Sequence, residues 1–260
     1  MSDSLCYVER PRDGVAVVVL RRADKRNALN IPLLESFCKR MENTNADMLN
    51  RVIILRGEGP VFCAGLDLQE AMEPENADRS AHLIAKALQS IYHSRCVTVA
   101  AVNGAAIAGG AGLMSACDFV VAADDAKFGY PEVFRGLVPG LVLTFLRRQV
   151  QERHVRELVL LGELIGAKRA LEIGLVNRIV PAASVMDEAL KLARQIMNGG
   201  PEALLRTKRQ LDSLWPNELS VDLQRALSQH MQARNSDEAQ EGIQAFLEKR
   251  KPVWQMGLDG

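Results

Sequence analysis

The feature that most constrains this chain is a glycine-rich junction that follows an apolar run near residue 100. The β-branched run 97–102 ends at an Asn103-Gly104 turn, and a cluster of glycines then opens a small-residue segment: Gly109, Gly110 and Gly112. That order predicts a buried strand, a tight turn and a buried helix. The first amides of a helix have no partner within it and lie at the positive end of its dipole, so the junction suits a developing anion. The same glycines would also be needed if they only let the helix pack against a sheet.

Two familiar nucleotide-binding loops do not fit this junction. Gly104 and Gly109 have the spacing of a P-loop, but Gly110 and Ala111 stand where the lysine and the hydroxyl residue are required. No Gly-x-Gly-x-x-Gly occurs anywhere in the chain. The loop is therefore interpreted as a site for something other than a nucleotide phosphate or a dinucleotide.

Length and charge narrow the class of protein. The 260 residues are 48% hydrophobic, which is enough for one large core with a small appended region. The 32 basic and 32 acidic residues give zero formal net charge, so no nucleic-acid partner is expected. Five cysteines without a C-x-x-C pair argue against a disulfide framework and a zinc site, and we expect no metal. Without a signal core or a membrane-length run, the chain is predicted to be cytoplasmic, with no membrane partner.

Periodicity predicts strands in the first part of the chain and helices after it. The expected strands are 5–9, 15–20, 51–56, 97–102, 119–123 and 175–180, and the expected helices are 31–43, 80–93, 141–149, 152–161, 167–173, 185–197, 201–214, 219–234 and 236–249. Residues 70–78 are polar and contain proline, which predicts a mobile loop. We expect a core at 1–199 that holds the site, and a helical region at 200–260 that covers it and supports oligomerisation, because exposed apolar stripes need a partner.

Two further stretches are candidates for ligand contact. The small residues of 61–68 place backbone close to a neighbour, as a ligand contact or as a bulge at a strand end. Lys25 and Arg26 lie in a charged loop that is either a solvated surface or a phosphate-binding edge of a cleft. The four histidines, His82, His93, His154 and His230, all fall in predicted helices and are interpreted as surface or packing residues.

What remains for chemistry is a set of backbone donors and one carboxylate. Glu132 follows Pro131 in a turn-rich passage, and no Gly-x-Ser-x-Gly elbow is present for a serine hydrolase. Main-chain donors with a single acid or base suit the stabilisation of an enolate, such as one formed at the α-carbon of a thioester. Burial would raise the pKa of such a carboxyl group toward the working pH.

Seven strings, in order and spacing, resemble the enoyl-CoA hydratase/isomerase (crotonase) family over nearly the whole chain. They lie at 24–30, 62–68, 102–110, 117–118, 128–132, 174–177 and 246–252. The resemblance implies an α/β fold of the ClpP/crotonase type, a spiral of stacked ββα units with a helical C-terminal trimerisation region. It implies an acyl-CoA substrate, a homotrimer or a dimer of trimers, and no separate cofactor, because coenzyme A is part of the substrate.

The resemblance also assigns roles to residues of this chain. The amides of Leu66 and Gly109 would form the oxyanion hole, and Glu132 would be the acid/base. Contacts to the substrate or its CoA are implied for Lys25, Arg26, Ala64, Gly65, Leu66, Asp67, Leu68, Gly109, Gly112 and Lys249.

One departure from the family pattern leaves the reaction open. Two-glutamate hydratases carry a first acid where this chain has Gly112. A single carboxylate suits a 1,3-proton shift, as in the Δ3,Δ2-enoyl-CoA isomerases, whereas hydration favours two groups. The alternative is a catalytically idle protein of this fold that binds acyl-CoA or RNA. Arg135 also stands out; it would face solvent, bind a carboxylate on the acyl group, or lower the pKa of Glu132.

Overall fold

A six-stranded sheet forms the centre of the computed structural model, which describes residues 5–71 and 73–255. The strands are β1 (Cys6–Arg12), β2 (Val15–Leu20), β3 (Val52–Gly57), β4 (Val97–Val102), β6 (Phe119–Ala123) and β9 (Arg178–Val180), adjacent in that order. β1 and β2 are antiparallel, and every later pair is parallel. β2 and β4 are buried along their whole length. Continuous apolar runs are what parallel strands covered on both faces require.

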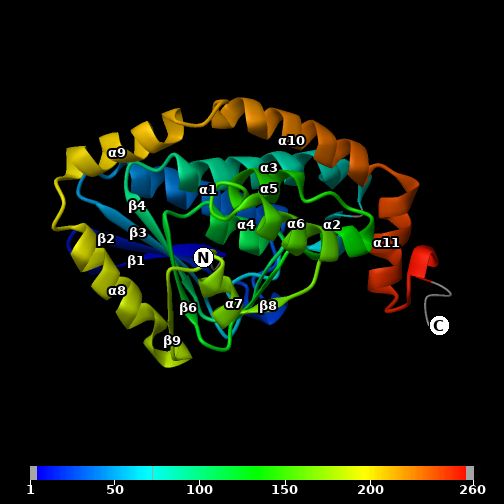
Figure 1. Cartoon of the computed structure of the whole chain (residues 1–260), viewed down its shortest axis with the longest axis horizontal. Coiled ribbons are helices and arrows are strands. Elements are labelled where there is room, and N and C mark those ends of the chain that lie inside the picture. The colour runs from blue at the N-terminus through cyan, green and yellow to red at the C-terminus, as the bar shows by residue number, and fades with distance from the viewer. Residues whose placement is uncertain (1–4, 72, 256–260) are drawn as a thin grey trace.

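Helices surround this sheet (Figure 1). They are α1 (Ile31–Ala46), α2 (Leu68–Ala71), α3 (Pro74–Tyr92), α4 (Gly109–Ser115), α5 (Gly140–Leu146), α6 (Glu152–Leu161), α7 (Ala167–Glu172), α8 (Val185–Ile196), α9 (Pro201–Ser213), α10 (Leu219–Arg234) and α11 (Asp237–Leu247). Figure 1 shows α8 on the opposite side of the sheet from α1 and α3. The buried helix predicted after the glycine cluster is confirmed as α4, in which every residue is buried. Among the described residues, no helix has the length and apolarity to cross a bilayer.

Two predicted elements are wrong. The loop expected at 70–78 is mostly helical, because α3 begins at Pro74, a residue that favours the first helical position, where its missing N–H is not needed. Met72, within that stretch, lies outside the described residues. The strand expected at 175–180 is shorter and comprises only β9, residues 178–180. It begins later because the amides of Leu175 and Val176 both donate to the Ala170 carbonyl at the end of α7.

The C-terminal helices pack on the core of their own chain. α10 lies along α3 and α5, as Figure 1 shows across the top of the molecule, and three of its buried side chains join the main core: Leu219, Leu223 and Ala226. α11 turns down beside the short helix η2 (Pro131–Arg135). The expected α/β architecture with C-terminal helices is thus confirmed, whereas a domain boundary at residue 199 stays a prediction.

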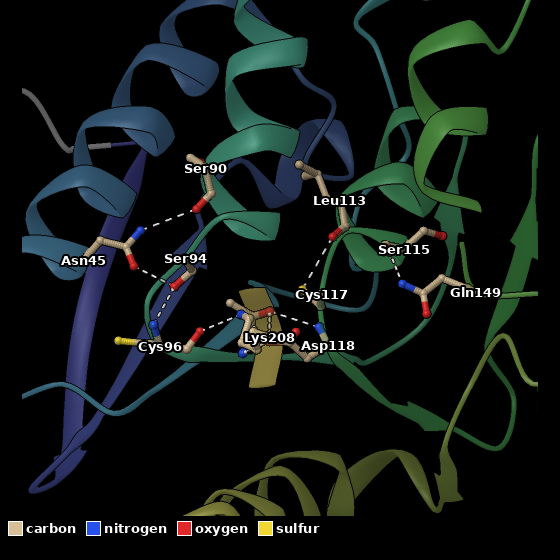
Figure 2. Close-up of polar contacts among 11 residues, drawn as sticks. Asn45, Ser90, Ser94, Cys96, Leu113, Ser115, Cys117, Asp118, Gln149 and Lys208 are labelled. Carbon is tan, nitrogen blue, oxygen red and sulfur yellow. Dashed lines mark hydrogen bonds and ion pairs between the residues drawn. The ribbon is translucent and has the colours of Figure 1, made fainter. Parts of the chain in front are cut away.

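A largely buried lysine ties α9 to the sheet (Figure 2). The Lys208 ammonium donates to Asp118 Oδ2 at 2.6 Å and to the Cys96 carbonyl at 2.9 Å. The same Asp118 oxygen accepts from the amide and the hydroxyl of Thr98 on β4, at 2.7 and 2.9 Å. One carboxylate therefore joins α9, β4 and the segment before β6.

Replacing this lysine is expected to destabilise the protein measurably. Lys208→Met leaves a poorly hydrated Asp118 without its cation, which should lower the free energy of unfolding by about 1 to 3 kcal/mol in a urea titration. Arg206→Met is the matched control, because Arg206 lies on the same helix in an exposed pair with Glu202. Such a pair contributes at most about 1 kcal/mol. Equal losses in the two variants would contradict the anchoring role.

Candidate functional site

Two glycine-containing passages that are distant in sequence lie side by side at the centre of the site. Cys63 forms the junction: its amide donates to the Ala105 carbonyl at 3.1 Å, and its carbonyl accepts from the Ile107 amide at 3.0 Å. A Cβ at Gly110 would lie 2.2 Å from the Cys63 carbonyl oxygen. Only glycine at 110 permits this approach, which explains one glycine of the cluster at the start of α4.

The approach brings two backbone amides together, those of Leu66 and Gly109. A Cβ built on Gly109 would lie 3.8 Å from Leu66 N, and one built on Gly65 would lie 3.3 Å from Gly109 N. The residues on either side of Leu66 pair with Leu29: the Leu29 amide donates to the Gly65 carbonyl and the Asp67 amide donates to the Leu29 carbonyl. Leu66 N therefore faces away from that pairing.

The Gly109 amide is left without a helical partner by its position. The first bond of α4 runs from Gly112 N to the Ala108 carbonyl, so Gly109 N precedes the helical hydrogen bonds. Within the part of the chain that the structure describes, neither Leu66 N nor Gly109 N donates a hydrogen bond to the protein. Two adjacent free donors are the arrangement that binds an oxyanion.

Backbone strain accompanies these amides. Ala108 has φ 48° and ψ −119°, and Gly65 has φ 90°. An alanine in that conformation is held there by its surroundings, here by the bond from its amide to the Gly129 carbonyl at 2.8 Å. Strained residues of this kind cluster at functional sites, where neighbouring structure fixes them.

Glu132 supplies the titratable group. It stands in the first turn of η2, directly after buried Pro131. Its Oε2 atom is buried and has no hydrogen-bond partner among the described residues. Burial raises its pKa from 4.5 to about 7, against the lowering effects of its own amide and of the Arg135 charge. A carboxyl group with this pKa can take and return a proton near neutral pH.

These groups line one cavity of about 300 Å³. Eight of the residues expected to act at the site line it: Lys25, Arg26, Ala64, Leu66, Asp67, Leu68, Gly109 and Glu132. Three others do not. Gly65 lies behind the wall, where its Cβ would be 2.9 Å from the Ile107 carbonyl oxygen, and Lys249 is exposed beyond α11. Gly112 lies inside the protein core.

A buried asparagine fixes the loop that carries Lys25 and Arg26. The Asn27 side chain is fully buried and donates to the carbonyls of Val61 and Phe62, at 2.8 and 3.2 Å. Arg26 and Asn27 both have φ 54°, a conformation that is common for asparagine and uncommon for arginine. No motif in the sequence indicated these hydrogen bonds, which hold the charged loop against the passage 61–68.

The position where two-glutamate hydratases carry their first acid has no room for a side chain. A Cβ at Gly112 would lie 2.4 Å from Val142 Cγ1 and 3.4 Å from Leu88 Cδ2. Val142, from α5, itself lines the cavity. The glycine and the valine therefore form one packed unit, in which the valine occupies the space beside the helix.

The close packing of Gly112 against Val142 leads to a prediction about stability. Gly112→Ala should lower the free energy of unfolding by about 1 to 3 kcal/mol through overpacking. In the double variant Gly112→Ala with Val142→Ala, the combined loss should be smaller than the sum of the two single losses, because the clash disappears. Chemical denaturation of the four proteins measures the coupling, and strict additivity would show that the two positions do not compete for space.

Some residues of the cavity were not found from the sequence. His230, interpreted above as a surface or packing residue, lines the cavity; its Nε2 atom is buried without a partner in the described structure, and burial lowers its pKa. Phe246 also lines it, next to Arg135, a residue that did stand out in the sequence; the arginine carbon Cζ lies 4.2 Å from the centre of the phenyl ring. His230 and Phe246 reach the cavity through the packing of α10 and α11, which local patterns do not specify.

Comparison with known proteins identifies the family of this chain. The family model for Enoyl-CoA hydratase/isomerase matches residues 10–257. A putative enoyl-CoA hydratase from Thermus thermophilus is 38% identical, over 94% of this chain and 99% of that protein. An enoyl-CoA isomerase/hydratase from Mycosarcoma maydis is 32% identical, over 97% and 98%. A crystal structure of a putative enoyl-CoA hydratase from Mycobacterium avium paratuberculosis superposes with a TM-score of 0.87 at 31% identity, covering 96% and 99%. The chain belongs to the enoyl-CoA hydratase/isomerase (crotonase) family.

Proposed function

We propose that this protein acts on an acyl-CoA thioester, with the Leu66 and Gly109 amides holding the thioester oxygen and Glu132 acting as acid/base. One observation carries the proposal. Two free backbone amides, from the two glycine-containing passages, lie in the same cavity as a carboxyl group whose pKa is raised. Loss of one such donor typically lowers kcat about 10²- to 10³-fold, so a pair supplies much of a rate enhancement.

The chemistry follows from these groups. When a proton leaves the α-carbon, or when water adds to the β-carbon, negative charge develops on the thioester oxygen, where the two amides stabilise it until a carbon atom is protonated. In a double-bond shift, Glu132 takes a proton from the α-carbon of a 3-enoyl thioester and returns it to the γ-carbon. In hydration, water adds its oxygen to the β-carbon while a proton reaches the α-carbon. Both reactions pass through charge on the same oxygen.

The packing around Gly112 favours the double-bond shift over hydration by two acids. With Val142 in that space, a second carboxylate has no place beside α4. One base that takes and returns the same proton is sufficient for the shift.

Coenzyme A enters with the substrate, at Lys25 and Arg26, whose cations suit its phosphates. A homotrimer or a dimer of trimers, and a cytoplasmic location, remain part of this proposal.

A mass-spectrometric assay tests the function. The purified protein is incubated separately with trans-2-enoyl-CoA and cis-3-enoyl-CoA thioesters. The products are separated by liquid chromatography, because the two isomers have equal mass, and are then followed for migration of the double bond and for gain of water. Migration without water gain identifies an isomerase, and a hydrated product identifies a hydratase. Tight binding of both thioesters without turnover would instead favour the idle binding protein and overturn the catalytic proposal.

A further inference from the structure

Arg135 is a cation placed on the same surface as the proposed acid/base. The two residues are three apart on η2, and side chains at i and i+3 of a 3₁₀-helix lie over one another. Both line the cavity. The backbone of Arg135 is fixed by α11, since a Cβ at Gly242 would lie 2.4 Å from its carbonyl carbon. Of the three alternatives for Arg135, a side chain that simply faces solvent does not fit, because the residue lines the cavity and its Nε atom is buried.

The guanidinium is held but not neutralised. Its Cζ lies 4.2 Å from the centre of the Phe246 ring, and Nη1 donates to the Pro131 carbonyl at 3.1 Å. Nε is buried and has no partner, and no carboxylate forms an ion pair with it among residues 5–71 and 73–255. Of the acids lining the cavity, Asp67 pairs with Arg22 at 2.7 Å. Glu132 acts on Arg135 through its charge alone.

Catalysis would leave the positive charge of Arg135 still less compensated. A buried cation without a counter-ion is unfavourable, so such groups are normally paired. Whenever Glu132 takes a proton from the substrate, Glu132 loses the negative charge that acts on Arg135. The neighbouring wall of the cavity is apolar, with Leu137 and Leu141. An anion that arrives with the substrate would satisfy the guanidinium throughout the cycle.

We propose that Arg135 binds a carboxylate on the acyl group, so that the preferred substrate is a CoA thioester of a dicarboxylic acid. This inference rests on the proposed acyl-CoA function. It assigns Arg135 the role of choosing the substrate, with Phe246 holding the planar guanidinium toward the cavity. A planar guanidinium matches the two oxygens of a carboxylate better than an ammonium does.

Binding of two saturated thioesters tests the inference without requiring turnover. Glutaryl-CoA and pentanoyl-CoA have acyl chains of equal carbon number, and only the first ends in a carboxylate. Calorimetric titration of the wild-type protein should show glutaryl-CoA binding roughly 10- to 100-fold more tightly, the range for a hydrogen bond to a charged group. Arg135→Met should abolish the preference, and Arg135→Lys should keep part of it. Arg156→Met, at an exposed site on α6, is the control and should keep it all.

The possible failures are distinguishable. Equal affinity of the wild-type protein for both thioesters would overturn the role of Arg135 and leave the acyl-CoA function standing, whereas binding of neither would overturn both. If Arg135 only lowered the pKa of Glu132, Arg135→Met would shift the pH profile of turnover upward equally for glutaconyl-CoA and 2-pentenoyl-CoA, without changing the preference. Thermal melting of each variant shows whether it is folded.

Discussion

Glu132→Gln is expected to lower kcat by about 10²- to 10⁴-fold, the usual contribution of a positioned acid or base. Glutamine keeps the length and the hydrogen-bonding capacity of the side chain but cannot accept and return a proton. The affinity for a saturated acyl-CoA should stay close to that of the wild-type protein, because the cavity and the amides of Leu66 and Gly109 are unchanged. Stopped-flow turnover and calorimetry on the same samples separate the two effects.

The pH profile should report the same group. The carboxylate is the form that removes a proton, and burial raises its pKa to about 7. We therefore expect kcat/KM to rise with pH around a midpoint near 7 and to level off above it. Glu132→Gln should remove this step. Full activity of that variant, or an unchanged wild-type rate well below pH 6, would show that another group moves the proton.

The free energy of unfolding should fall as pH rises, whereas kcat/KM should increase. Because the folded-state pKa of Glu132 lies above the ordinary value of 4.5, the folded protein binds this proton more tightly than the unfolded chain. The stabilisation is therefore fully present below pH 4.5 and is lost as pH rises through about 7. Above pH 7 the wild-type protein holds a buried carboxylate that the glutamine variant lacks. Glu132→Gln should consequently lose less stability than the wild-type protein between pH 5 and 8, which urea titrations at several pH values measure.

The local features of the site were predictable from the sequence because glycine and proline occur in few structural contexts, mainly turns and the ends of helices. The helix that opens at Gly109 and the acid behind Pro131 each follow from short patterns. The order of strands and helices likewise follows from buried apolar runs such as 15–20. The family motifs then singled out Leu66, whose own side chain carries no chemistry.

The assembly of the site was less predictable. The passage 61–68 meets the glycine-rich passage through a single bridge between Cys63 and Ala106, in the two-residue strand β5 (Ala106–Ile107), which is too short to leave an alternating pattern. His230 reaches the cavity because α10 crosses over α3 and α5, and an apolar stripe does not specify its partner. The role of Gly112 depended on Val142, a residue of another helix.

Gly65→Ala should separate the two oxyanion-binding amides and so disable the site. Gly65 has φ 90°, and an added Cβ would lie 2.9 Å from the Ile107 carbonyl oxygen and 3.0 Å from Ala108 Cβ. Both contacts are with the other glycine-containing passage. The methyl group would therefore push the two passages apart and move Leu66 N away from Gly109 N. Loss of one donor from such a pair lowers kcat by about 10²- to 10³-fold.

A matched control separates this displacement from ordinary backbone strain. Gly174 also has positive φ, 81°, but nothing lies within 4 Å of where its Cβ would be. Gly174→Ala should therefore cost about 1 to 2 kcal/mol of stability from the left-handed conformation alone and leave kcat unchanged. Gly65→Ala should lose kcat even at temperatures where melting shows it to be folded. If the folded variant retained normal turnover, the adjacent amides of Leu66 and Gly109 would not be the groups that stabilise the thioester oxygen, since their separation is what the added methyl group changes.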